Sequence, residues 1–537
     1  MTANNPAISP GSATPAPHPR GDPAGTDPEK AAAMASDRDQ DQDRDMEQGH
    51  ARPSKRAVAH RLLTYGRVEE RGAVPVPLEE RTSTRYFNVF TIWFSMNVNI
   101  LAITFGMLGP SYGLGLRDSA LVILFFTMAT TLFPAYLSTL GPKTGMRQMV
   151  QARFSFGRYM VSLPILLNLA TMTGFCVIIC VVGGQCLSAV TSGSLSPNLG
   201  IVLTALLSLG ISFCGFKVLH FYETYAWIPA LIAIVIAVGC GGSHLKDQAP
   251  PVETPPPAPA VVSFAMIVAS YMIPWACLAS DFTTYFNPDP SGGGGSSLRI
   301  FAYTYLGLCV PTTLLMTLGA AIAGAVPSVP EWDEGYAETM VGGVLAAMLA
   351  PAGNFGKFVV VVLAFTLLGN ISGTMYSITL NFQILVPQLV KVPRYVFSVV
   401  ITAVVIPVAI CAAVDFFANL ENFVALIGYW SAAFVSIVIT EHVVFRRRRG
   451  RGGGGRGGDC DEYSHETWNR ASKLPLGAAA LVSAVLSFGL IIPCMDQVWY
   501  QGPIAETTGD IGFEVALVLC SVLYVPLRFL ERKFTGR

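Results

Sequence analysis

The sequence predicts an all-α polytopic membrane protein with twelve transmembrane helices. Its 537 residues are 52% hydrophobic and only 13% charged, whereas a typical soluble domain carries about 25% charged residues. Twelve apolar runs, each close to or above the ~20 residues that a helix needs to cross a bilayer, follow one another after residue 85. These runs are 86–109, 118–140, 161–190, 199–216, 222–241, 261–280, 300–326, 355–386, 395–414, 422–445, 474–493 and 512–530.

The same pattern divides the chain into five segments. Residues 1–80 are rich in Pro, Ala, Asp, Arg and Gly and lack apolar periodicity, which predicts a disordered cytoplasmic tail. Residues 81–445 contain the first ten runs and form the expected transport core. A basic, glycine-rich cytoplasmic loop follows at 446–473, then two peripheral transmembrane helices at 474–530 and a short cytoplasmic tail at 531–537.

Loop charge orients these helices in the membrane. If the chain starts inside, the five cytoplasmic loops contain 16 Lys and Arg residues, whereas the external loops and adjoining helix ends contain three. Because positive residues are retained on the cytoplasmic side, we expect both termini in the cytoplasm. The external loops then include an acidic one between the seventh and eighth runs. The arginine run at 446–458 is expected to lie on anionic lipid rather than on nucleic acid.

The first run carries polar groups where lipid offers no hydrogen bond. The segment from Tyr86 to Pro110 contains no charge, yet its centre holds Ser95, Asn97 and Asn99. Such groups either bond a neighbouring helix or face a watery cavity. Ser95 and Asn97 are two residues apart and point in different directions on a regular helix. A ligand that binds both therefore requires a locally unwound helix, as many transporters have at mid-membrane.

The sixth run contains a helix breaker near its centre. Pro274 removes a backbone donor, which predicts a break or kink, and Trp275 directly follows it. Trp275 either packs in the core or offers a flat face on which an aromatic ring could stack. Because the first and sixth runs are five helices apart, the pattern indicates two five-helix halves of inverted topology with discontinuous helices at matching positions.

The eighth run becomes polar in its second half. From Gly369 onward it contains small and polar residues that include Asn370, Gly373 and Thr374. Such residues suit either close helix packing or a lined cavity.

The sequence gives little support to other classes of protein. The formal net charge is zero, so the sequence lacks the excess of positive charge that is typical of nucleic-acid-binding proteins. The 11 cysteines and seven histidines are scattered without zinc spacing or a catalytic arrangement, so we expect no metal and no cofactor. A membrane-embedded enzyme would need a nucleophile–base pair, and a channel would show charged rings or repeated filter segments. Both stay remote alternatives, because broken helices fit a transporter with alternating access better.

Five segments resemble fungal purine-cytosine permeases of the nucleobase-cation-symport-1 family: FSMNVNILAITFGMLGP, GLRDSALVILFF, LGPKTGMRQMVQARFSFGR, YETYAWIP and SDFTTYF. The resemblance implies a LeuT-like fold with 5+5 inverted repeats, to which the chain adds two helices. It also implies transport of nucleobases, related ring compounds or vitamins together with protons or sodium. Fungal members are proton symporters of the plasma membrane.

The resemblance further implies where a substrate would bind. Ser95 and Asn97 match the first-helix pair that contacts the base, and Trp275 matches the sixth-helix tryptophan that stacks on it. Phe175 stands where purine-cytosine permeases have the third-helix tryptophan. An aromatic pair, Phe175 and Trp275, is therefore retained.

Two amides of the family pattern are replaced. Ile179 stands at the third-helix asparagine, and the eighth-helix Pro-Asn falls on Gly373 and Thr374, although Asn370 fits. When the protein loses such amides, fewer polar edges of a substrate ring can be hydrogen-bonded, and this changes which rings are preferred. The expected substrate is a nucleobase, cytosine or a purine, and the alternative is vitamin B6 or another small heteroaromatic. We expect a coupling proton rather than sodium, surrounding membrane lipid, and no obligate protein partner.

Overall fold

The computed structural model describes residues 72–191, 194–213, 225–288, 295–386, 388–389, 392–446 and 463–537. These residues are mostly helical, because a backbone inside lipid must satisfy its hydrogen bonds within its own segment. The one sheet among them is a hairpin of two short antiparallel strands, Asp496–Gln497 (β1) and Tyr500–Gln501 (β2).

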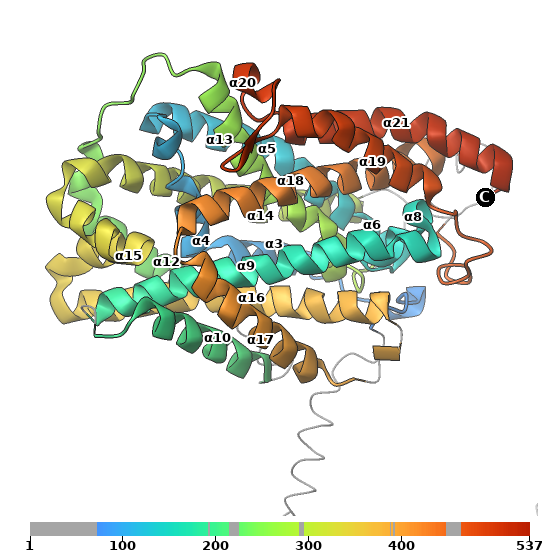
Figure 1. Cartoon of the computed structure of the whole chain (residues 1–537). Coiled ribbons are helices and arrows are strands. Elements are labelled where there is room, and N and C mark those ends of the chain that lie inside the picture. The colour runs from blue at the N-terminus through green and yellow to red at the C-terminus, as the bar shows by residue number, and fades with distance from the viewer. Residues whose placement is uncertain are drawn as a thin grey trace, which may run out of the picture. The chain divides into compact units, whose positions relative to one another are not determined.

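Each predicted apolar run overlaps a helix of the structure (Figure 1). Within the described ranges, nine helices are long and apolar enough to span a membrane, and one bent pair would make a tenth. The predicted twelve spans also count α10 and α19, which are shorter. In chain order the helices are α3 (Phe87–Asn97) with α4 (Ile100–Gly106), α5 (Leu116–Ser138), α9 (Ser162–Val190), α10 (Pro197–Phe213), α12 (Trp227–Gly241), α13 (Ala258–Met272), α14 (Gly295–Ala325), α16 (Gly353–Leu385), α17 (Arg394–Ala412), α18 (Phe416–Thr440), α19 (Ala478–Ile491) and α21 (Gly512–Thr535).

The first helix is broken in its middle. α3 ends at Asn97, α4 begins at Ile100, and the two helices are bent by 59°. Asn99 lies in the gap with an extended backbone. Its side-chain oxygen accepts from the Leu101 amide at 2.8 Å, and its Nδ2 donates to the Met96 carbonyl at 2.7 Å. Asn99 therefore caps α4 and satisfies groups that the break would leave unpaired. The predicted local unwinding is confirmed.

The sixth helix breaks at the predicted proline. α13 ends at Met272 and is followed by two 3-10 segments, η4 (Ile273–Cys277) and η5 (Ala279–Phe282). Pro274 stands in the first turn of η4, where its missing amide hydrogen costs no helical bond. The two broken helices are the first and the sixth of the series, as the predicted inverted halves require.

One helix occupies the segment predicted to be an acidic external loop. α15 (Pro330–Leu349) lies between α14 and α16 and packs against α9. Its backbone leaves helical geometry at Thr339 and Met340, and the φ angle of Met340 is 50°. The apolar stretch after this kink is about half the ~20 residues that a span needs. The hydrophobic pattern alone therefore assigned this helix to a loop.

α9 lies at the centre of the helix packing. It contacts α10, α15, α16 and α17, and Figure 1 shows α9 and α16 running alongside each other. α14 packs on α5 and on both halves of the broken first helix. Two glycines permit this approach: a Cβ on Gly106 would lie 1.9 Å from the Met316 carbonyl oxygen, and one on Gly319 would lie 2.0 Å from that of Ile103. Backbone-to-backbone contact thus holds α4 against α14.

Buried charges join the last two helices to the core. α19 and α21 pack on each other and on α18, which continues into a π-helical turn, η9 (Glu441–Arg446). Glu441 is fully buried, and its carboxylate accepts from Arg446 at 2.8 Å, from Arg528 at 3.1 Å and from the Tyr524 hydroxyl at 2.8 Å. One carboxylate therefore links the end of α18 to two side chains of α21.

Residues 72–80, which the sequence assigns to the N-terminal tail, pack on the core. Ala73 and Val76 are buried, and the Val76 amide donates to the Gly145 carbonyl at 2.8 Å. The buried Arg81 side chain donates to the carbonyl oxygens of Val76 and of residues 142–144 at 2.9 to 3.2 Å. The packed part of the chain therefore begins before the predicted boundary, and residues 1–71 lie outside the described residues.

Deleting residues 1–71 is expected to leave uptake per surface-exposed molecule unchanged, since that composition predicts no packed core. Deleting 1–81 also removes Arg81 and its four hydrogen bonds to carbonyls, and a hydrogen bond from a charged group contributes ~1.5–3 kcal/mol. We expect the longer deletion to lower the melting temperature and the surface yield. Equal melting temperatures for the two deletions would contradict this assignment.

The basic loop is described only from residue 463 onward. There the His465 Nε2 atom contacts the Thr144 carbonyl at 2.7 Å, and the Arg153 guanidinium lies 5.0 Å from the Trp468 ring centroid. This half of the loop packs on the core. Residues 447–462, which include most of the arginine run, lie outside the described part of the chain.

Candidate functional site

A small cavity lies where the broken sixth helix faces α9 and α16. Its volume is about 20 Å³. Ligand pockets for small molecules are typically ~300–1,000 Å³, so the cavity in this conformation is too small for a heteroaromatic ring. The cavity is lined by Asn168, Thr171, Met172, Phe175, Pro274, Trp275, Leu278, Asn370 and Thr374.

The two aromatic residues singled out in the sequence both line this cavity. Phe175 is partly buried and contacts other rings edge-on, Tyr271 at 6.5 Å and Phe423 at 5.8 Å between centroids. Trp275 is 9% exposed and meets Trp93 edge-on at 5.6 Å. The Trp275 indole N–H is buried and has no hydrogen-bond partner among the described residues. The proline break thus places a flat ring with an unused donor at the cavity.

Two predicted polar residues of the eighth helix also line the cavity. Asn370 donates from Nδ2 to the Met96 carbonyl at 3.0 Å, which ties α16 to the last turn of α3. The Thr374 hydroxyl donates to the Asn370 carbonyl at 2.8 Å and lies 3.4 Å from its Oδ1. Asn370 therefore already holds the broken first helix, and a ligand would share or replace that contact.

Ser95 and Asn97 do not line the cavity. Both are buried in the last turn of α3, and Asn97 donates from Nδ2 to the Trp93 carbonyl at 2.9 Å. The Asn97 Oδ1 atom is buried without a partner in the described residues. Because the gap begins at residue 98, both side chains remain on regular helix and diverge. The unwinding was predicted correctly, but it starts after this pair instead of including it.

Ile179 and Gly373 are buried outside the cavity lining. Ile179 has no exposed surface and lies one turn beyond Phe175 on α9. Gly373 lies on α16 directly before Thr374 and is also buried. Of the eight predicted site residues, the structure brings Phe175, Trp275, Asn370 and Thr374 together and leaves the other four around them.

Two polar residues of the cavity lining were not predicted. Asn168 donates from Nδ2 to the Asn381 Oδ1 atom at 3.4 Å, and its own Oδ1 is buried without a partner in the described part of the chain. The Thr171 hydroxyl accepts from the Trp430 indole at 3.0 Å. Asn168 and Thr171 lie seven and four residues before Phe175, so helical periodicity could have placed them on the same face of α9.

Residues 75–453 match the model of a family described as permeases for cytosine/purines, uracil, thiamine and allantoin, which is more than half of the chain. This chain belongs to that family. The purine-cytosine permease fcyB of Emericella nidulans is 34% identical over 486 residues, 90% of this chain and 92% of fcyB. The vitamin B6 transporter TPN1 of Saccharomyces cerevisiae is 28% identical over 507 residues, 86% of this chain and 87% of TPN1.

A solved structure of the same fold supports the architecture. Mhp1, a nucleobase-cation-symport-1 family transporter in a closed conformation with bromovinylhydantoin bound, aligns with a TM-score of 0.65. The alignment covers 87% of this chain and 96% of Mhp1 at 16% sequence identity. The chain therefore has the LeuT-like transporter fold that the resemblance implied. It is a multi-pass membrane permease and not an enzyme.

Proposed function

We propose that the chain is a symporter that takes up a small, flat, nitrogenous ring of the nucleobase class by alternating access. The observation that carries this proposal is the cavity in which Phe175, Trp275, Asn370 and Thr374 meet beside two broken helices. Aromatic faces can stack on a heteroaromatic ring, and amide and hydroxyl groups can bond its edge. The unpaired Trp275 N–H and Asn168 oxygen offer one donor and one acceptor for that edge.

The coupling ion, location and orientation are part of the same proposal. A proton is the coupling ion that the resemblance to fungal permeases implies, and the plasma membrane is the expected location. The lining of the cavity contains no carboxylate. A carboxylate that carries the proton would therefore lie outside that lining. The excess of positive charge in alternate loops supports cytoplasmic termini.

Uptake of radiolabelled rings tests the proposal. Cells that lack their own carriers would express the full chain and receive cytosine, adenine, hypoxanthine, uracil or pyridoxine, with and without a protonophore. We expect saturable accumulation of at least one compound, unchanged chemically and abolished by the protonophore. Accumulation of none of them at normal surface expression would overturn the proposed substrate class, and accumulation that ignores the protonophore would overturn proton coupling.

Thr374→Asn is expected to shift preference toward cytosine and adenine. Thr374 lines the cavity, and an amide there reaches farther than a hydroxyl and offers both a donor and an acceptor. One regained hydrogen bond contributes about 0.5–1.5 kcal/mol, or roughly two- to tenfold in affinity. Competition of each unlabelled ring against the best substrate measures the shift. An unchanged competition profile would show that Thr374 does not set selectivity.

Ile179→Asn provides the contrasting variant. Ile179 is fully buried and does not line the cavity, so an asparagine there places an amide among apolar neighbours at a cost of about 1–3 kcal/mol. We expect a lower melting temperature without a change in substrate preference. If Ile179→Asn instead changes preference at normal stability, the ligand reaches deeper along α9 than the cavity indicates.

A vitamin B6 carrier is the second candidate. Thr374 lines the cavity at a position where the family pattern has an amide, which leaves one partner fewer for the polar edges of a purine and favours a ring with fewer such edges. TPN1, a vitamin B6 transporter, is among the relatives of this chain. The same uptake panel separates the candidates, because a B6 carrier would take up pyridoxine in preference to cytosine and adenine.

A further inference from the structure

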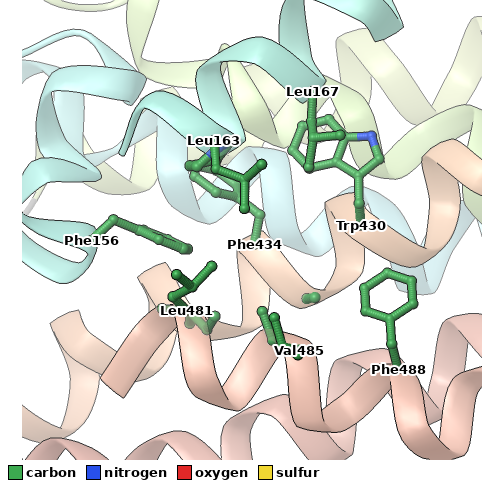
Figure 2. A pocket seen from close by; sticks show the side chains of 12 residues that line it. Phe156, Leu163, Leu167, Trp430, Phe434, Leu481, Val485 and Phe488 are labelled. Carbon is green, nitrogen blue, oxygen red and sulfur yellow. The ribbon is translucent and has the colours of Figure 1, made fainter. Parts of the chain in front are cut away.

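A second, larger cavity lies on the outer side of the bundle, between α18, α19 and the start of α9 (Figure 2). Its volume is about 90 Å³. It includes one residue of α8 (Arg153–Met160), which ends where α9 begins. We call it the apolar groove; its lining is Phe156, Leu163, Pro164, Leu167, Trp430, Ala433, Phe434, Ile437, Leu481, Ala484, Val485 and Phe488.

The apolar groove offers a ligand no polar group. Every lining side chain is a hydrocarbon except that of Trp430, and the Trp430 indole N–H already donates to Thr171 at 3.0 Å. Phe156 stacks on Phe434 at 5.8 Å between centroids, which gives one wall a flat aromatic surface. A ligand whose hydroxyl has to lie inside the groove, such as a sterol bound by its polar end, would find no hydrogen-bond partner there for that hydroxyl. A plain hydrocarbon chain has no such requirement.

The groove opens toward the surrounding membrane. Leu163 is 46% exposed, Leu167 37% and Val485 61%, although all three lie on helices of the membrane bundle. The lining residues of α19 run from Leu481 to Phe488, an interval of seven residues and a length of about 10 Å along the helix. The groove is thus a slot along the helix axis that the lipid phase can enter from the side.

Two cationic residues belong to the chain segments at one end of the groove, and a buried carboxylate there, Glu531, is paired with Arg528 at 3.2 Å. Beyond Phe156 the chain continues to Arg158, which is half-buried, and the exposed Lys473 precedes α19. The segment that leads into α19 packs on α8, because a Cβ on Gly477 would lie 1.9 Å from the Phe156 carbonyl oxygen. Both cations therefore belong to segments that meet at this end, where a negatively charged lipid headgroup would be favoured.

We propose that the apolar groove binds one acyl chain of an anionic phospholipid, whose headgroup lies by Arg158 and Lys473. The bound chain contacts Trp430, and Trp430 bonds Thr171, which lines the candidate substrate cavity. The lipid site and the substrate cavity thus share a wall. Lipid occupancy is expected to stabilise the position of Trp430 and so of Thr171.

Photolabelling of the full-length protein in nanodiscs tests the proposal independently of transport. The probes are phosphatidylglycerol and phosphatidylcholine with the same diazirine-bearing acyl chain, and a diazirine-bearing sterol. Mass spectrometry locates the labelled peptides. We expect phosphatidylglycerol to label 163–167 and 481–488 about fivefold more than phosphatidylcholine for each cation that contacts the headgroup.

Variants separate the groove from the general lipid surface. Ala484→Trp fills the groove and is expected to remove most of the label, with Ala484→Leu intermediate. Leu486→Trp places the same side chain on an exposed part of α19 outside the lining and should keep the label. Arg158→Gln with Lys473→Gln should equalise the two phospholipids.

Three results would overturn the proposal. The first is equal labelling of the Ala484 variants and the unmodified protein, each eluting as a monodisperse peak in size-exclusion chromatography. The second is equal labelling by both phospholipids before any substitution. The third is a sterol probe that labels the groove more strongly than phosphatidylglycerol and is lost in Ala484→Trp, which would make a sterol the occupant.

Discussion

Trp275→Ala is expected to weaken the apparent affinity for the transported ring about tenfold or more. Ring stacking contributes roughly 0.5–1.5 kcal/mol beyond area burial, and truncation also removes apolar contact in the cavity. Uptake kinetics at several substrate concentrations would show the loss as a raised KM. Trp275→Phe keeps a stacking face and should recover most of the affinity, though not the indole N–H.

The control for this variant is Trp499→Ala. Trp499 is 63% exposed in the β1–β2 turn and lines neither cavity, so its loss should leave KM unchanged. Trp275 also packs against Trp93, and surface expression must therefore be measured with uptake. An unchanged KM for Trp275→Ala at normal surface expression would show that the ring does not stack on Trp275.

Glu441→Gln is expected to destabilise the protein by about 3–5 kcal/mol, which is the usual cost of removing one partner from a buried ion pair. Glu441 has no exposed surface, and its loss leaves the buried Arg446 and Arg528 without their shared carboxylate. Since these contacts join α18 to α21, we expect the two peripheral helices to detach from the core first. Thermal unfolding in detergent, followed by fluorescence-detected size-exclusion chromatography, measures the effect.

Glu506→Gln makes the same chemical change at an exposed position before α21. Substitutions at such surface positions usually change stability by less than about 0.5 kcal/mol. A melting temperature for Glu441→Gln equal to that of Glu506→Gln would contradict the role of the buried network. Substrate preference should stay the same in both variants, because neither residue lines the candidate substrate cavity.

Much of the fold could be predicted because lipid imposes strong rules on a chain. Apolar length located the helices, and Pro274 located the break in the sixth helix. α15 was missed because its apolar part is too short to span, while tertiary packing against α9 stabilises it. Residues 72–80 were missed for a similar reason: Val76 is held by a backbone bond to Gly145, and composition carries no signal for such a contact.

The candidate site was predictable in part. Chemistry visible in the sequence singled out Trp275, Asn370 and Thr374, and the family resemblance implied Phe175. Three-dimensional packing brings the four together. The position of the gap in the first helix depends on capping by Asn99, which a hydrophobic pattern does not resolve to one residue. Asn168 was missed because its role depends on the face of α9 that turns toward α16.

The central claim is that the transported ring binds between Phe175 and Trp275, and a structure with the ring bound tests it most directly. The full-length protein in nanodiscs would be saturated with the compound that gives the lowest KM in the uptake panel and examined by cryo-electron microscopy. We expect planar density stacked on Trp275, with Phe175 at its other side and Asn370 at its edge. Planar density elsewhere in the bundle, with the cavity between α9, η4 and α16 unchanged at about 20 Å³, would contradict the claim.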